Sequence, residues 1–197
     1  MNNYNKDFIR VSKSLTFSDE EQKELYPLIK EILESDKWIE MMNMSHHLES
    51  RSIHSLEVCC LSWRRAKSMK NCDEKAVAIG SILHDFFFYD WQTEKANIDD
   101  LLINKSKFLP SKHGFIHPTI ALDNAIKYFP HLIDTKVADI IVKHMWPLTL
   151  NPPRFKESWL VCYTDKGCSF KIIKTPKELP RYLGIKKLKP RVNPKTK

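Results

Sequence analysis

Apolar residues recur at intervals of three and four along most of this chain, and no segment shows a convincing alternation of apolar and polar residues. The first spacing places side chains on one face of an α-helix, whereas a half-buried strand needs alternation. Only four of the 197 residues are glycine. The sequence therefore predicts an all-α fold, and its length suits one domain with a substantial core.

Six helices are expected from this spacing and from the signals at their ends. The first follows Ser18, which stands three residues before Glu21 in a capping-box arrangement. Pro118 is expected in the first turn of its helix, where proline is well tolerated. That helix has a predicted core stripe of Leu122, Ala125, Ile126 and Phe129. The other helices are expected at 53–69, 73–86, 134–146 and 155–170, with a long loop at 91–112.

Positive charge is concentrated at the C-terminal end of the chain. The net charge is +8, but residues 171–197 alone carry ten Lys or Arg and one Glu, so the other 170 residues carry a net charge of −1. We predict a basic, flexible tail at 171–197, a helical core at 46–170 and an N-terminal helical segment at 1–45 that packs on this core. Because the body is nearly neutral, we expect no specific nucleic-acid binding.

The N-terminal residues are polar, and no apolar run approaches the length of a membrane span. The five cysteines are odd in number and form no CxxC pair, which favours reduced thiols over a disulfide framework. The sequence therefore predicts a cytoplasmic protein without membrane association, and it leaves a homodimer open.

Several ionisable residues fall where the periodicity predicts a core. In GSILHDFFFYDW, residues 80–91, His84 and Asp85 stand among aromatic residues. A buried carboxylate costs several kcal/mol unless an arginine, a backbone cap or a cation compensates it. His144 continues an apolar stripe, and Asp165 ends the apolar run SWLVCYTD. With His54 and His117, each expected to open a helix, these residues form a set of imidazoles and carboxylates typical of divalent-metal sites.

The order of these residues resembles that in the HD superfamily of metal-dependent phosphohydrolases, which is named for its His-Asp doublet. IHSLEVCCLSWRRAKSM is similar to the first helix of that family, AVAIGSILHDF to the helix that ends in the doublet, and LVCYTDK to the helix that carries the last aspartate. The additional histidines, in IHPTIALDNA and IVKHMWPL, resemble the pattern of the HD enzymes that cleave diadenosine tetraphosphate.

The resemblance implies an all-α HD-domain bundle and one metal held by His54, His84, Asp85 and Asp165. It implies a second metal held by His117 and His144, with Asp85 bridging the two. The expected ions are manganese or iron, with nickel, cobalt and magnesium as the other candidates, and either one or two ions. Asp85 would also be catalytic through the water that the metals activate. Lys166, beside Asp165, is a candidate for neutralising a leaving phosphate, and a surface lysine is the alternative interpretation. The expected substrate is a small phosphorylated molecule, with a nucleotide as the expected class.

Four further residues are candidates for substrate binding: His46 and Arg51 upstream of the first helix, His113 in the same segment as His117, and Arg154 in NPPRF. Arg51 and Arg154 offer guanidinium groups, which suit phosphate. Each of the four is equally compatible with a solvated surface position or with a part in orienting substrate.

One alternative is an HD-fold protein whose metal has a structural or sensing role without catalysis. Many members of the family carry a lysine after the doublet, whereas here Phe86, Phe87, Phe88 and Tyr89 follow it. A second alternative, nucleic-acid binding through the basic tail, predicts salt-sensitive binding that is lost on truncation near Lys186.

Overall fold

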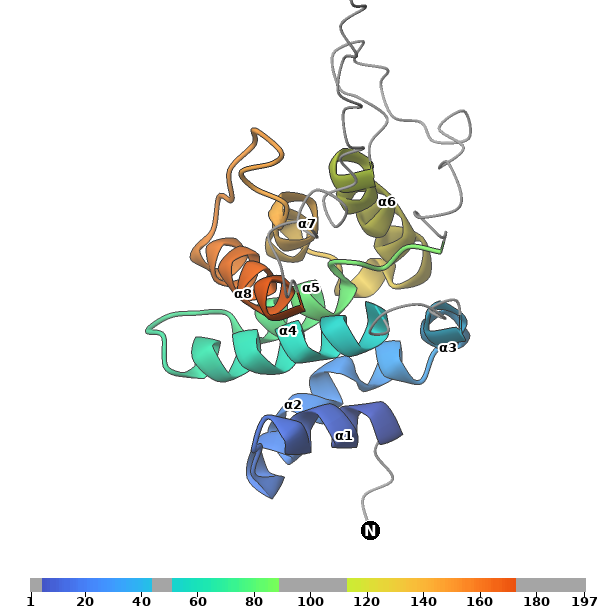
Figure 1. Ribbon diagram of the computed structural model, residues 1–197, viewed down its shortest axis with the longest axis vertical. Helices are drawn as coiled ribbons and strands as arrows, with labels where there is room; N and C mark the ends of the chain where they lie inside the picture. Colours follow the sequence, from blue (N-terminus) through green and yellow to red (C-terminus); the bar gives the residue numbers. More distant parts are fainter. Residues whose placement is uncertain (1–4, 44–50, 89–112, 173–197) are drawn as a thin grey trace, which may run out of the picture.

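The computed structural model describes residues 5–43, 51–88 and 113–172 (Figure 1). These residues form helices and connecting segments, and no strand occurs among them. The α-helices are α1 (Lys6–Ser14), α2 (Asp19–Leu33), α3 (Asp36–Asn43), α4 (Arg51–Lys67), α5 (Glu74–Leu83), α6 (His113–Tyr128), α7 (Thr135–Lys143) and α8 (Lys156–Ile172), with a short 3-10 helix, η2, at Pro130–Leu132. The predicted all-α class is confirmed for the described residues.

Side-chain caps begin several of these helices where the sequence predicted them. Ser18 accepts a hydrogen bond from the Glu21 backbone, and Glu21 accepts one from the Ser18 backbone, which completes the capping box of α2. Asp73 caps α5 through the Ala76 amide, and Asp134 caps α7. These caps satisfy backbone amides that have no partner inside a helix.

The structure differs from the expected helices in three places. The short helices α1 and α3 were not predicted individually. Helix α6 begins at His113, so Pro118 lies inside the helix rather than in its first turn. Ile126, expected in the core stripe of α6, is 48% exposed. The predicted loop at 91–112 and the tail from 173 onward lie outside the described residues.

Helix α5 is the centre of the bundle. It contacts α2, α4, α6, α7 and α8, and every residue from Ala76 to Leu83 is buried. Such a helix is apolar on all sides because all its faces meet other helices. Figure 1 shows α1 and α2 at one end of the molecule and α6 and α7 at the other, with α4 and α5 between them.

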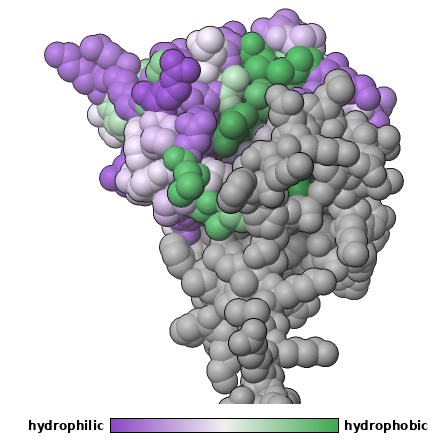
Figure 2. Space-filling model, turned by 90° about the horizontal axis from the view of Figure 1, so that it is seen from above, coloured by the Kyte–Doolittle hydropathy of each residue, from purple (hydrophilic) through white to green (hydrophobic). Residues whose placement is uncertain are grey.

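The N-terminal helices bury side chains in the same core as the central helices. Phe8, Leu25 and Trp38 belong to one hydrophobic cluster with Leu56 and Leu83. On the face seen in Figure 2, hydrophilic residues and patches of hydrophobic residues lie beside one another. None of the described helices combines the length and hydrophobicity that a membrane span requires.

Candidate metal centre

The His84-Asp85 doublet directly follows the last residue of α5. His84 is the C-cap of this helix, so the buried helix delivers both side chains to the interior. One turn earlier, a Cβ atom on Gly80 would lie 2.7 Å from Cγ2 of Ile140 on α7. The missing side chain therefore lets α5 and α7 approach closely. Their C-caps meet as a result, and the rings of His84 and His144 have centroids 4.9 Å apart.

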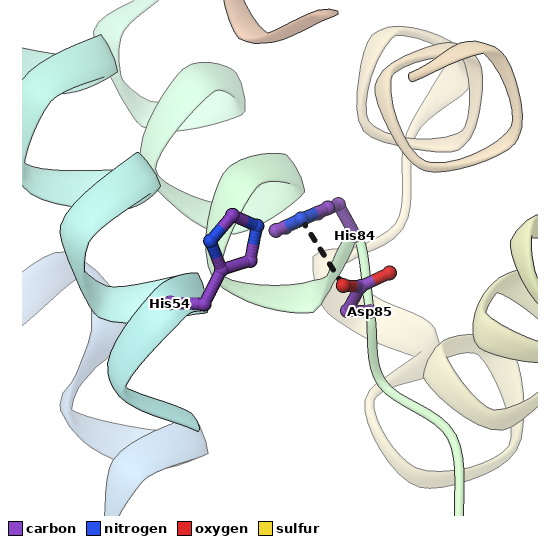
Figure 3. A group of neighbouring side chains, drawn as sticks. All are labelled: His54, His84 and Asp85. Carbon is purple, nitrogen blue, oxygen red and sulfur yellow. Dashed lines mark ion pairs between the residues drawn. The ribbon is translucent and has the colours of Figure 1, made fainter. Parts of the chain in front are cut away.

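One group of possible ligands consists of His54, His84 and Asp85, whose ligand atoms all lie within 4.8 Å of one another. Figure 3 shows the His54 ring, from α4, and the His84 ring pointing toward each other, with Asp85 beside His84. Asp165 on α8 adds a carboxylate: its Oδ1 is 2.9 Å from Nε2 of His54 and 3.6 Å from Nε2 of His84. We call these four residues the first cluster.

The second group consists of Asp85, His117 and His144, again with ligand atoms within 4.8 Å of one another. Nε2 of His117 lies 2.9 Å from Nε2 of His144 and 3.2 Å from Oδ1 of Asp85. Nε2 of His144 lies 3.6 Å from the same carboxylate oxygen. We call these three residues the second cluster. Helices α6 and α7 bring its imidazoles to the doublet.

Asp85 belongs to both clusters, and its two oxygens face different partners. Oδ2 is the oxygen nearest Nε2 of His84, at 3.6 Å, whereas Oδ1 is the one near His117 and His144. A carboxylate that presents one oxygen to each of two ligand groups has the arrangement of a bridging ligand. The side chain of Asp85 is 17% exposed, more than any other side chain of the two clusters.

Backbone carbonyls orient two of the imidazoles. Nδ1 of His84 donates to the Ser81 carbonyl and Nδ1 of His144 to the Ile141 carbonyl, each at 2.7 Å. A neutral imidazole that donates through Nδ1 carries its lone pair on Nε2, and this is the form that binds a metal. In both residues that Nε2 atom is directed toward Asp85.

Burial and mutual charge shift the acid–base properties of the site. Burial lowers the pKa of His84, but the carboxylates of Asp85 and Asp165 outweigh it and raise this pKa to about 9. Burial, together with charge on His84 and His117, lowers the pKa of His144 to about 3, so this imidazole is neutral. Burial raises the pKa of Asp85 and of Asp165, yet the imidazoles around them bring both pKa values below the usual range. Two buried carboxylates thus attract positive charge to this point.

The donor set fits a divalent ion. Nε2 of His84 is buried and has no hydrogen-bond partner among the described residues. Two nitrogens bound to one metal at about 2.1 Å and at a right angle lie about 3.0 Å apart. The 2.9 Å separation of the Nε2 atoms of His117 and His144 is close to that spacing, whereas the 2.9 Å contact between His54 and Asp165 joins a nitrogen to an oxygen at an ordinary hydrogen-bond distance. Imidazole and carboxylate are ligands that manganese, iron, cobalt, nickel and zinc share.

The structure brings together all six residues that the sequence singled out as candidate ligands: His54, His84, Asp85, His117, His144 and Asp165. They come from α4, α6, α8 and the ends of α5 and α7. They are separated by up to 111 positions in the chain, as for His54 and Asp165. The predicted site did not include the carbonyls of Ser81 and Ile141, which accept hydrogen bonds from His84 and His144. Each carbonyl stands three residues before a histidine at a helix end.

The other candidate residues lie in different surroundings. Nη1 of Arg51 donates to the Phe87 carbonyl at 2.6 Å, and its guanidinium lies 3.9 Å from the centre of the Phe87 ring. That ring in turn faces the His117 ring, with centroids 5.6 Å apart. Arg51 also stands one helical turn before His54. It therefore lies beside the two clusters.

Lys166, on α8, contacts the backbone at the end of α7 and one turn earlier in its own helix. Its Nζ donates to the carbonyls of His144, at 2.7 Å, and of Cys162, at 3.5 Å. Arg154 has an exposed side chain and precedes α8, whose first residue, Lys156, lies about 14 Å along the helix from Asp165. Its backbone amide donates to Oδ2 of Asp139 on α7 at 2.9 Å, and among the described residues it does not contact the clusters. His113 is the first residue of α6, one turn before His117. His46 lies outside the described residues.

None of the protein-family models, curated proteins and solved structures compared with this chain matches it. The geometry of the site shows His and Asp side chains in the interior that could hold a metal ion.

Proposed function

We propose that this protein is a metal-dependent phosphohydrolase of the HD type, which cleaves a phosphate ester or anhydride with a metal-activated water. The single observation that carries the proposal is the placement of Asp85, with Oδ2 toward the first cluster and Oδ1 toward the second. Two ions that share this carboxylate would lower the pKa of a water between them and would bind the oxygens of a phosphate.

The charge of the site supports an anionic substrate. Asp85 and Asp165 contribute two negative charges, so a single divalent ion would neutralise them. Two such ions would leave the centre with about two positive charges, which a phosphate group could compensate. A nucleotide is the substrate class that the resemblance to HD enzymes favours, and the basic side chains near the centre suit its phosphates.

Two basic residues are candidates for contact with phosphate. Arg51 lies beside the second cluster through Phe87 and beside the first through His54. The ammonium of Lys166 donates to backbone carbonyls, including that of His144, and so lies close to the ligands. We assign Arg51 to substrate binding and retain Lys166 as the cation that would neutralise a leaving phosphate.

The test is a hydrolysis screen of protein loaded with manganese or ferrous iron. Nucleoside mono-, di- and triphosphates and dinucleoside polyphosphates would be the substrates, and Asp85→Asn would be the matched variant. We expect turnover by the wild type and a loss of at least about a hundredfold in Asp85→Asn, since the bridging charge is removed. Metal-loaded wild-type protein that hydrolyses none of these compounds would contradict the proposal.

A second candidate function is a structural or sensing metal centre without catalysis. The side chains of His84 and His144 are 0% and 1% exposed, and a closed ligand shell is typical of structural metal sites. This alternative predicts stoichiometric metal and a higher melting temperature with nucleotide, but no turnover. The same screen therefore separates the two functions.

A further inference from the structure

The segment that follows the doublet is held from two sides. Residues Phe86 to Phe88 lie beyond the end of α5, where backbone hydrogen bonds from Phe86 to Leu83 and from Phe87 to Asp85 form a turn. Nδ2 of Asn124, on α6, donates to the Phe86 carbonyl at 3.0 Å, and Arg51, on α4, donates to the Phe87 carbonyl. The polypeptide next to Asp85 is thus tied to a helix of each ligand cluster.

The tie to α6 bears directly on the second cluster. Asn124 stands seven residues after His117, which is two helical turns and places both side chains on one face. His117 approaches Asp85, with its Nε2 3.2 Å from Oδ1, while Asn124 bonds to the very next residue, Phe86. Two successive residues, Asp85 and Phe86, therefore contact two residues on the same face of α6 that lie two helical turns apart.

Apolar packing and one directional hydrogen bond both hold α6 against the doublet segment. The buried face of α6 includes Ile116, Ile120, Ala121 and Ala125, and the hydrophobic effect that favours their burial is not directional. A hydrogen bond to a carbonyl is directional and has a narrow range of distances. The Asn124 amide therefore adds a contact that restricts where α6, and with it His117, lies along the doublet segment.

We propose that Asn124 is a positioning residue for the second metal ion, because it holds His117 at bonding distance from the ion that Asp85 and His144 would share. This inference rests on the proposed two-metal function. No residue of α6 belongs to the first cluster, so loss of the Asn124 hydrogen bond should weaken binding of the second ion more than binding of the first. A loss of affinity that is larger for the second ion than for the first would therefore distinguish this positioning role from a general structural role.

The test uses the full chain with Asn124→Ser and Asn124→Leu, and the neighbouring Asp123→Ser as the matched control on an exposed position of the same helix. Binding of manganese would be followed by titration calorimetry and by electron paramagnetic resonance, in which two ions that share a carboxylate give an exchange-coupled spectrum. Circular dichroism would establish that each variant is folded. These readouts do not depend on turnover.

We expect two manganese ions in the wild type and in Asp123→Ser. In both Asn124 variants we expect the first ion to bind as before, the second to bind at least about tenfold more weakly, and the coupled spectrum to disappear. A folded Asn124 variant that keeps both ions at wild-type affinity would overturn the inference and leave the proposed function standing. A wild type that binds no manganese would overturn both, and equal loss of both ions in the variants would show a structural role instead.

Discussion

Asp85 is the residue on which the site depends, because each of its oxygens lies nearest a different set of imidazoles. His84 and His144 present Nε2 to this carboxylate because carbonyls three residues earlier hold their Nδ1 atoms. The sequence could predict the ligand types and their order. It could not predict which carboxylate oxygen faces which histidine, since this depends on the rotamer of Asp85 and on the turn after α5.

At this scale, the two histidine clusters should lose metal independently. His117→Ala removes a ligand of the second cluster only, so we expect one ion to remain. His84→Ala removes a ligand of the first cluster and should weaken the binding of the ion held by that cluster by on the order of a hundredfold. Elemental analysis after equilibrium dialysis against manganese measures both. Two ions in His117→Ala, or unchanged metal in His84→Ala, would contradict the assignment of these ligands.

At the scale of the helices, the approach of α5 to α7 determines whether the clusters can meet. Spacing and end signals located α2, α4, α5, α7 and α8 from the sequence. The short α1 and α3 have too few turns for a clear stripe, and Pro118 suggested a start for α6 that lies four residues too late. The Gly80–Ile140 contact could not be predicted, because it joins two helices across sixty positions.

This contact gives a paired prediction. Gly80→Ala places a methyl group 2.7 Å from Cγ2 and 2.8 Å from Cβ of Ile140, so α5 and α7 must separate. We expect a loss of about 1–3 kcal/mol in the free energy of unfolding. Gly167→Ala on α8 is the control, since nothing lies within 4 Å of its Cβ position, and it should stabilise by about 0.5–1 kcal/mol. Urea unfolding measures both, and equal effects of the two substitutions would refute the packing argument.

Glu157 links three helices and predicts how acid affects the fold. Its carboxylate accepts from the Asp73 amide, at the start of α5, and from Nζ of Lys136 on α7. Burial opposes the charged form, but these bonds outweigh it and lower the pKa of Glu157 below its ordinary value of about 4.3. A lowered pKa contributes stability that is present above that ordinary value and is lost as the pH falls through the folded value.

Glu157→Gln should therefore cost about 1 kcal/mol at pH 7, because the amide retains one acceptor but not the charge. The difference from the wild type should shrink as the pH falls below about 4. Unfolding by urea at a series of pH values measures this difference. A difference that stays constant from pH 7 to pH 3 would contradict the role of the carboxylate.

At the scale of the whole molecule, the candidate metal centre lies in the interior of the helical bundle. Helices far apart in sequence supply its ligands, and the apolar clusters around them exclude water. The convergence of six residues could be proposed from the sequence only through resemblance to the HD pattern, because periodicity shows that a residue faces inward but not what it meets. Asn124 was not predicted for the same reason, although it lies seven residues after His117 and therefore on the same face of the helix.

A centre of this kind should couple metal binding to folding. The folded chain brings the ligands together, whereas the unfolded chain does not, so metal at a hundred times its dissociation constant should stabilise the fold by about 2.7 kcal/mol. For a chain of this size we expect removal of metal by a chelator to lower the melting temperature by roughly 5–10 °C. Differential scanning calorimetry of the loaded and chelated protein tests this. An identical melting temperature would count against an interior metal.

The metal centre is tested most directly by an anomalous-scattering map at the manganese edge from crystals of the loaded protein. We expect two peaks on either side of Asp85, one among His54, His84 and Asp165 and the other between His117 and His144. A map with no peak at this carboxylate, from protein that binds manganese elsewhere, would contradict the metal centre and the hydrolase built on it.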